Sequence, residues 1–153
     1  FGGYDPRTLK NFAYYETVGG GMGASPESSG LSGVHTHMTN TRNTPIEAIE
    51  HYLPLRLRRY SLRKFSGGSG RYSGGDGIVR EYEFISPCKV NILSERRKFS
   101  PYGLQGGKPG KAGRNVLIQA GKEKLLGSKA SLKVKKGDVL VVETPGGGGY
   151  GKP

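Results

Sequence analysis

The second half of the chain alternates hydrophobic and polar residues with a period of two. In residues 55–63, for example, Leu55 and Leu57 alternate with arginines. Such alternation is typical of a strand with one buried face. Similar strand-like stretches follow, separated by glycine, serine and proline, at residues 77–85, 88–95, 115–119, 130–136 and 138–144. The pattern predicts a compact β-domain, a sandwich or a barrel, over residues 55–153.

A short helix is predicted over residues 45–53, just before this domain. Thr44 is placed to act as the N-cap, Pro45 suits the first helical position, and Glu47 completes a capping box. Three apolar residues then recur at helical spacing, and a proline at position 54 ends the segment. The sequence therefore predicts a mainly β protein with one short helix.

The first 54 residues form a glycine-rich segment that is expected to be mostly loop. One strand is predicted over residues 12–18, and a strip of glycines follows it at once. Backbone amides in such a strip can line an anion or a substrate, although a turn with close backbone packing is the alternative. The candidate substrate contacts in the strip are Gly19, Gly20, Gly21 and Gly23.

Glycine makes up 27 of the 153 residues, which indicates many turns or backbone that lies close to other groups. No fixed period runs through these glycines, so the composition does not indicate collagen. Residues 146–152, GGGGYGK, match the spacing of a phosphate-binding loop. However, neither Ser or Thr nor a helix follows, so a nucleotide site is not predicted there. The glycines are instead expected to let the tail lie flat against a neighbouring surface.

The formal net charge of +12 raises the question of anionic partners. Lysines and arginines are spread along the chain, and no standard nucleic-acid motif is present, so nucleic-acid binding is disfavoured. The charge is instead expected on solvated surface or against an acidic partner subunit. No apolar run reaches the length of a membrane span. The lone cysteine, Cys88, suits a reducing cytoplasm and is expected to be a small buried residue.

Two histidines, His35 and His37, would project to the same face of an extended segment. Three roles stay open for them: structural hydrogen bonding, contact with a substrate or phosphate, and metal ligation, for which no third ligand lies nearby. The catalytic candidates are therefore His35, His37 and Asn40, and Asn43 joins the substrate-contact candidates. Farther along, Arg96 and Arg97 could bind a carboxylate or phosphate, or serve a surface or interface.

Four long stretches together resemble the hydantoinase B/oxoprolinase family. They cover essentially the whole chain in order: YYETVGGGMGASPESSGLSGVHTHMTNTRNTPIEAIE, SGGSGRYSGGDGIVREYEF, LSERRKFSPYGLQGGKPGKAGRN and GDVLVVETPGGGGYG. The family includes N-methylhydantoinase B subunits, the C-terminal part of 5-oxoprolinase and related acetone carboxylase subunits. Family members are several times longer, and these stretches resemble their C-terminal portion, so the resemblance implies a truncated or split B subunit.

The resemblance implies ATP-dependent opening of a small cyclic amide. It implies two protein partners: a hydantoinase A-type subunit that binds ATP, and the remaining N-terminal part of the B subunit, with which residues 1–54 would form a catalytic domain. A divalent metal and ATP are implied for the whole complex, bound outside this chain. An acetone carboxylase-type fragment and a non-catalytic docking module for the other subunit remain alternatives.

Overall fold

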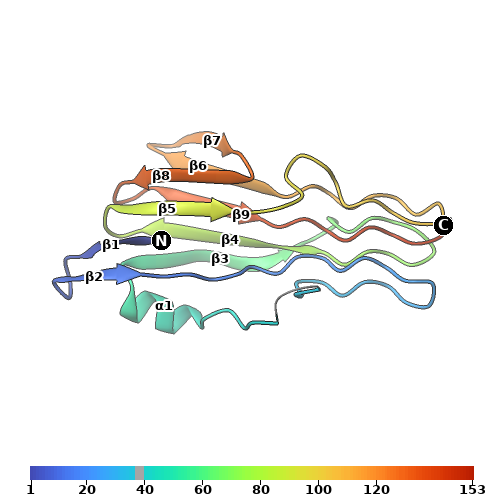
Figure 1. Cartoon of the computed structure of the whole chain (residues 1–153), viewed down its shortest axis with the longest axis horizontal. Coiled ribbons are helices and arrows are strands. Elements are labelled where there is room, and N and C mark those ends of the chain that lie inside the picture. Colours follow the sequence, from blue (N-terminus) through green and yellow to red (C-terminus); the bar gives the residue numbers. More distant parts are fainter. Residues whose placement is uncertain (37–39) are drawn as a thin grey trace.

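The protein is described by a computed structural model that covers residues 1–36 and 40–153 (Figure 1). Within these residues it is mainly β with a single short helix, as the sequence predicts. No helix in this part of the chain is long and apolar enough to cross a membrane. The elements are β1 Gly2–Asp5, β2 Lys10–Ala13, α1 Ile46–Tyr52, β3 Leu55–Arg63, β4 Gly77–Phe84, β5 Cys88–Leu93, β6 Arg114–Gln119, β7 Lys122–Leu126, β8 Lys129–Val134 and β9 Val139–Glu143.

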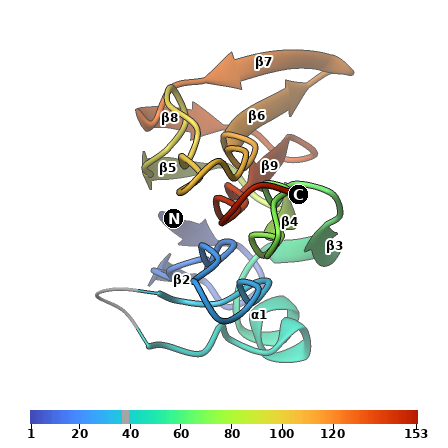
Figure 2. The same ribbon diagram turned by 90° about the vertical axis from the view of Figure 1, so that its right-hand side faces the viewer.

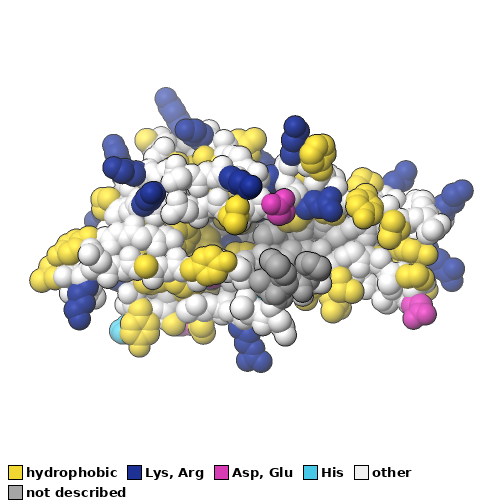
Figure 3. All heavy atoms as spheres, viewed as in Figure 1, with side chains coloured by type: hydrophobic (Ala, Val, Ile, Leu, Met, Phe, Trp, Pro, Cys, Tyr) yellow, Lys and Arg dark blue, Asp and Glu magenta, His cyan; other side chains and the backbone are white. Residues whose placement is uncertain are grey.

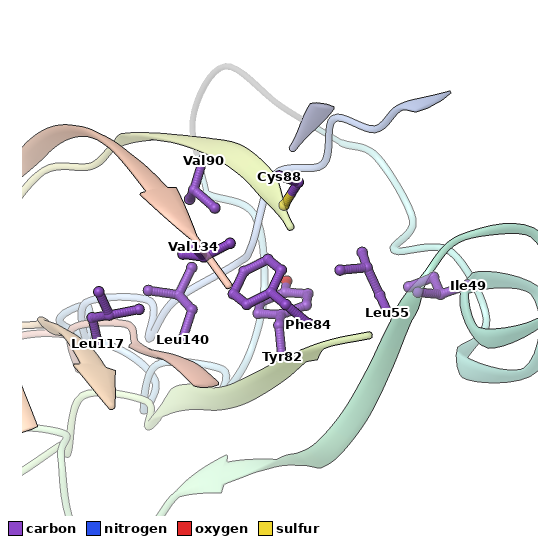
Figure 4. Close-up of a cluster of buried hydrophobic side chains, with 9 residues drawn as sticks. All are labelled: Ile49, Leu55, Tyr82, Phe84, Cys88, Val90, Leu117, Val134 and Leu140. Atoms are coloured by element: carbon purple, nitrogen blue, oxygen red, sulfur yellow. The ribbon is translucent and has the colours of Figure 1, made fainter. Parts of the chain in front are cut away.

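The strands form two antiparallel sheets that pack face to face as a sandwich. One sheet has the order β2-β1-β5-β8, and the other has the order β3-β4-β9-β6-β7. Both sheets supply side chains to one hydrophobic core (Figure 4). Its buried members are Ile49, Leu55, Tyr82, Phe84, Cys88, Val90, Leu117, Val134 and Leu140. The sandwich confirms the compact β-domain, while β1 and β2 add strands from before residue 55 to the sheet of β5 and β8.

Strand β4 shows how the period of two builds this core. Arg80, Tyr82 and Phe84 are at most 2% exposed and share the inner face. Glu81 and Glu83 lie on the other face, each 3.8 Å from an arginine of β3. The alternation therefore separates an inner, buried row from an outer row of ion pairs.

Strand β3 departs from strict alternation at a β-bulge. Its pairing with β4 shifts register between Leu57 and Arg59. As a result, Leu57 pairs with Tyr82 and Tyr60 pairs with Arg80, although Leu57 and Tyr60 are three residues apart. An extra residue in one strand inverts the faces that follow it. The bulge thus places the Tyr60 ring on the same face as Arg80.

The N-terminal strand prediction was wrong in position. Strand β2 ends at Ala13, and residues 14–19 carry no strand ladder. Strand β1, which the sequence analysis treated as loop, pairs with β2 and with β5, more than 80 residues away. The aromatic run at residues 12–18 indicated the buried face of a strand. In the structure, two of its residues, Tyr14 and Glu16, instead make polar contacts with each other.

Two local predictions also need correction. The helix begins at Ile46, with Pro45 as its N-cap, and no side chain caps it, so the predicted capping box does not form. Its stability comes instead from Ile49, which is fully buried in the core beside Leu55. Strand β7 was not predicted because KEKLL does not alternate. A two-residue turn at Ala120 and Gly121, both with positive φ, forms the hairpin with β6.

All of the long chain segments outside the sheets leave the sandwich at the same end (Figure 1). We call the extended parts of these segments, residues 19–34, 66–76, 101–113 and 144–151, the glycine bundle. Hydrogen bonds join the segments along their length. Viewed end-on, the C-terminal segment lies in the middle of the others (Figure 2). The tail of the protein is therefore an interior element of the bundle, rather than a flap on a neighbouring surface.

The hydrogen bonds of this central segment repeat every three residues. Neighbouring segments are contacted in turn: 21–24 by Pro145 and Gly148, 108–111 by Gly146 and Gly149, and 72–75 by Gly147 and Tyr150. A chain that returns to the same side every third residue has the helical repeat of polyproline II. The bundle therefore shares its local geometry with collagen, although its sequence has no collagen period.

Close backbone approach explains why the central segment is glycine. A Cβ atom at Gly147 would overlap the carbonyl oxygen of Met22, and one at Gly148 would overlap that of Tyr102. From Gly146 to Gly149, each residue lies against a different piece of neighbouring backbone, so none of the four has room for a side chain. The sequence expectation of backbone lying close to other groups is confirmed, and the other groups are backbone of the same chain.

Asp76 does not form the two-residue hairpin turn that Asp-Gly would favour. Its Oδ1 accepts hydrogen bonds from the amides of Ser66 and Gly67, at 2.8 and 2.9 Å, which closes the long β3–β4 connection. Burial raises the pKa of Asp76, but these hydrogen bonds outweigh burial and hold its pKa below the ordinary value of 3.8.

This lowered pKa predicts a stability contribution that is lost in acid. A carboxylate with a lowered pKa stabilises the fold above its unfolded pKa, and this contribution disappears as the pH falls through the folded pKa. The unfolding free energy of the wild-type chain should therefore fall below about pH 4, and Asp76→Asn should lose part of that pH dependence. Urea unfolding at pH 7, 4 and 3 measures it. The exposed Glu27→Gln change is the control, and an unchanged acid dependence in Asp76→Asn would contradict the assignment.

Candidate functional site

A cluster of polar and aromatic side chains joins the segment after β2 to the inner face of β3 and β4. Glu16 is at its centre. Its Oε2 accepts hydrogen bonds from the Tyr14 hydroxyl at 2.8 Å and from Asn43 Nδ2 at 3.0 Å, and its Oε1 accepts one from the Tyr82 hydroxyl. We call Tyr14, Glu16, Asn43, Tyr60, Arg80 and Tyr82 the Glu16–Arg80 cluster. It ties together four segments that are far apart in the sequence.

Arg80 is the buried cation of this cluster. Its side chain is 0% exposed, and its Nε lies 3.1 Å from Glu16 Oε1, close enough for an ion pair. The Tyr60 ring covers the guanidinium, with its centroid 4.4 Å from Cζ, and the Tyr82 ring lies at 5.5 Å. Within residues 1–36 and 40–153, none of the three guanidinium nitrogens, Nε included, has a hydrogen-bond partner. Among these residues, the guanidinium thus has an ion-pair contact at Nε and no contact with an acceptor at Nη1 and Nη2.

The phenols of Tyr14, which is half-buried, and Tyr82, which is buried, remain protonated at neutral pH. Burial raises the pKa of Tyr14 to about 12, and burial together with the Glu16 carboxylate raises the pKa of Tyr82 well above its usual value. Both hydroxyls therefore donate to Glu16. The cluster can fix a carboxylate and orient a cation, but these tyrosines are not poised to exchange protons near pH 7.

The structure brings one predicted site residue, Asn43, into the cluster. Its Nδ2 also donates to the Thr17 carbonyl at 2.7 Å, and its Oδ1 accepts from the Tyr60 hydroxyl at 3.3 Å. Nearby, the hydroxyls of Thr17 and Thr41 lie 2.6 Å apart. The chain before the helix is thereby held against the segment after β2. The role of Asn43 as a substrate contact stays a prediction.

The four glycine candidates lie in the glycine bundle. The amides of Gly20 and Gly21 donate to the carbonyls of Val34 and Pro145, at 3.1 and 2.9 Å. Gly19 is buried against Val34, whereas Gly23 is exposed and lines a groove. The close-packing alternative describes Gly19, Gly20 and Gly21, and their contact with a substrate remains a prediction.

Of the catalytic candidates, His35 is half-buried, Asn40 is exposed, and His37 lies outside the described residues. In the described part of the chain, no group of three His, Cys, Asp or Glu side chains is arranged to hold a metal ion. The described residues therefore do not supply a ligand set for the divalent metal that the family resemblance implies. The roles of His35 and Asn40 remain predictions.

The arginine pair predicted from the sequence separates in the structure. Arg97 Nε and Nη2 donate to Oδ1 of the buried Asn115, at 3.2 and 3.1 Å, and burial lowers the pKa of Arg97 to about 10. Arg96 instead lies over the Tyr102 ring, 5.7 Å from its centroid. Arg97 has a structural role in the sheet, and only Arg96 faces a groove.

Cys88 and the lysines behave as the sequence predicts. Cys88 is 8% exposed in the core, and burial raises the pKa of its thiol to about 11, so it is not an activated nucleophile. Lysine and arginine side chains are scattered over the visible face of the protein instead of gathering in one patch (Figure 3). On this face the basic side chains do not form the continuous stripe of a nucleic-acid-binding surface.

Two hollows in the surface are lined in part by residues of the candidate site. A groove of about 210 Å³ on the glycine bundle is lined in part by Gly23, Arg96 and Tyr102. A second, of about 200 Å³, has Tyr60 and Ile78 in its wall. Both residues are direct neighbours of Arg80, across the β3–β4 pair and along β4. The second hollow therefore borders the Glu16–Arg80 cluster.

The sequence analysis did not identify Glu16, Arg80 or Tyr82. One signal was available for Arg80: it occupies a position that alternation assigns to the inner face, between Ile78 and Tyr82. A charge at such a position is rarely tolerated without a partner or a function. Its partner, Glu16, is 64 residues earlier, and nothing local in the sequence connects the two.

Comparison with known proteins gives a consistent result. The model of the hydantoinase B/oxoprolinase family matches residues 1–153. The chain is 53% identical over 141 residues to 5-oxoprolinase 1 of Arabidopsis thaliana, covering 92% of this chain and 11% of that protein. It is 31% identical over 145 residues to a putative D-/L-hydantoinase B-type subunit of a Pseudomonas species, covering 93% of this chain and 24% of that protein.

A solved structure shows the same fold. The ATP-dependent caprolactamase of Pseudomonas jessenii superposes with a TM-score of 0.77 at 24% identity, over 99% of this chain and 28% of that protein. The chain thus spans about a tenth to about a quarter of the length of these proteins.

Proposed function

The chain belongs to the hydantoinase B/oxoprolinase family, and from this premise we propose that it acts as the C-terminal portion of the B-type polypeptide of an ATP-dependent cyclic amide hydrolase. The observation that carries the proposal is the 53% identity to 5-oxoprolinase 1 over nearly the whole chain. The 31% identity to a B-type hydantoinase polypeptide supports the same reaction class. The substrate is a small cyclic amide, and the protein acts in the cytoplasm.

Two partners complete this enzyme in the proposal. The remaining N-terminal part of the B-type polypeptide supplies the metal site, as the family resemblance implies. ATP is held by a hydantoinase A-type subunit. In this proposal the glycine bundle is the frame of the chain, and hydrogen bonds from Thr41 and Asn43 hold the residues just before α1 against the segment after β2.

Reconstitution tests the proposal. The 153-residue chain alone should hydrolyse neither 5-oxoproline nor hydantoin with ATP, whereas the chain assembled with the rest of the B-type polypeptide and an A-type subunit should. Product and ADP release are measured together. Turnover by the purified chain alone, or none by the complete assembly, would overturn the proposal. Carboxylation of acetone by the same assembly, with bicarbonate and ATP, would identify a carboxylase instead. If the other subunits are active without this chain and need it only to associate, the chain is a docking module.

Alanine substitutions test the polar strip in the assembled enzyme. We expect His35→Ala, His37→Ala and Asn40→Ala to lower turnover strongly with nearly unchanged melting temperature, because these side chains would face the substrate. The largest loss is expected at His37. A structural role would instead cost about 1–3 kcal/mol of stability, with activity falling only in proportion to folded enzyme. His51→Ala, on the exposed end of α1, is the control. Unchanged turnover in all three variants would remove the strip from the active site.

A further inference from the structure

Arg80 carries more hydrogen-bonding capacity than its surroundings use. Its side chain is 0% exposed, yet Nη1 and Nη2 have no partner within residues 1–36 and 40–153. A guanidinium has five N–H donors and no acceptor, so water or a protein oxygen must normally satisfy them. Burying an ion with unpaired donors is among the costliest arrangements in a protein interior. Such a group is expected to gain an acceptor in the working protein.

Among the described residues, the neighbours of Arg80 cannot supply that acceptor by a small rearrangement. Both oxygens of Glu16 are already engaged, by Tyr82 on one side and by Tyr14 and Asn43 on the other. Turning the carboxylate toward Nη1 and Nη2 would break these hydrogen bonds. The ring of Tyr60 attracts the cation through its π-face, but this attraction leaves the in-plane N–H donors unpaired. The cluster therefore holds the guanidinium in place and leaves its Nη1 and Nη2 edge without an acceptor.

The second hollow lies beside the residues that flank Arg80. The hollow of about 200 Å³ is walled in part by Tyr60 and Ile78, the immediate neighbours of Arg80 on the inner face. Tyr60 is 45% exposed, whereas the arginine beneath it is not exposed at all. Tyr60 thus lines the hollow and also lies against the Arg80 guanidinium. A rotation of this one ring, anchored by a single 3.3 Å hydrogen bond to Asn43, would join them.

The unused edge of a guanidinium matches one ligand chemistry best. Two parallel N–H groups bind the two oxygens of a carboxylate in a bidentate pair. On the basis of the proposed function, we propose that Arg80 is the specificity residue that receives the carboxylate of a carboxylate-bearing lactam, of which 5-oxoproline is the simplest five-membered case. The hydantoin ring has no such group. The site would therefore select acidic lactams over uncharged cyclic amides.

Ligand binding to the assembled enzyme, without ATP, tests this inference. Calorimetry compares 5-oxoproline with 2-pyrrolidinone, the same ring lacking the carboxylate. Wild-type enzyme should prefer 5-oxoproline, and Arg80→Gln should weaken its binding about 100-fold, the scale of losing a buried charge-assisted pair. Binding of 2-pyrrolidinone should not change. Arg97→Gln is the control, because it alters a half-buried arginine whose Nε, Nη1 and Nη2 already donate to Asn115 and the Glu95 carbonyl, and it should leave the preference intact.

A second variant covers the case in which Arg80→Gln does not fold. Tyr60→Ala keeps the arginine and removes its cover, so an arginine-specific dicarbonyl reagent should now modify Arg80. Addition of 5-oxoproline should protect Arg80 from modification, and 2-pyrrolidinone should not. Equal protection by both compounds would overturn the inference.

Other outcomes separate this inference from the proposed function. If Arg80→Gln leaves 5-oxoproline binding unchanged but weakens association with the rest of the B-type polypeptide, the acceptor is a protein group, and the inference is wrong. If the wild-type assembly hydrolyses cyclic amides while Arg80 variants show unaltered substrate preference, only the inference fails. If the wild-type assembly neither binds nor hydrolyses them, the proposed function fails with it.

Discussion

Replacing Gly147 by alanine is expected to destabilise the chain by about 3 kcal/mol or more. A Cβ atom there would overlap the carbonyl of Met22, and this backbone cannot move alone because the same segment bonds to other parts of the bundle. Gly147 also donates to Gly75 and accepts from Gly68, both at 2.8 Å, and a shift that relieves the overlap would break these bonds. Urea unfolding followed by circular dichroism measures the change.

Gly127→Ala is the matched control for this result. Gly127 follows β7, and a Cβ atom there would meet nothing closer than the Lys129 carbonyl oxygen at 3.6 Å, an ordinary contact. Its effect on stability should lie within about 0.5 kcal/mol, as for most surface substitutions. If Gly147→Ala proved as mild as this control, the bundle would not be the tightly packed element described above.

Glu16→Gln is expected to cost about 3–5 kcal/mol of stability, because it removes the negative partner of a fully buried cation. The substitution also places an NH₂ group among the hydroxyls of Tyr14 and Tyr82 and the amide of Asn43, all of which donate to Glu16. At least one buried donor would then be left unpaired. Equilibrium unfolding at pH 7, with the melting temperature as a second readout, gives the loss.

Glu81→Gln provides the comparison for this prediction. Glu81 pairs with Arg59 at 3.8 Å on the outer face of the same sheet, where both side chains are partly exposed. Exposed ion pairs contribute at most about 1 kcal/mol, so this change should be small. Similar losses for the two variants would show that burial of the Glu16–Arg80 pair does not control its energy. High salt should reduce the effect of Glu81→Gln and leave that of Glu16→Gln nearly unaltered.

The sequence by itself determined the features that depend on residues close together in the chain. Alternation over residues 77–85 predicted β4, because a period of two indicates a strand with one buried face, and the short apolar run within residues 138–144 predicted β9. The apolar spacing around Ile49 located the helix for a similar reason. The burial of Cys88 followed from its chemistry. Of the site, the sequence singled out Asn43 but not the carboxylate to which it donates.

Only the tertiary structure decided the features that depend on distant partners. The β3 bulge, which places Tyr60 over Arg80, is a property of pairing with β4 and leaves no local signal. The glycines show no period in the sequence, because the segments that contact the central segment of the bundle come from separate parts of the chain. Each position there is glycine because of the backbone beside it, not because of its neighbours in sequence. For the same reason the sequence showed Arg80 only as one charged residue in a strand, until folding buried it against Glu16 and left its Nη1 and Nη2 donors unused.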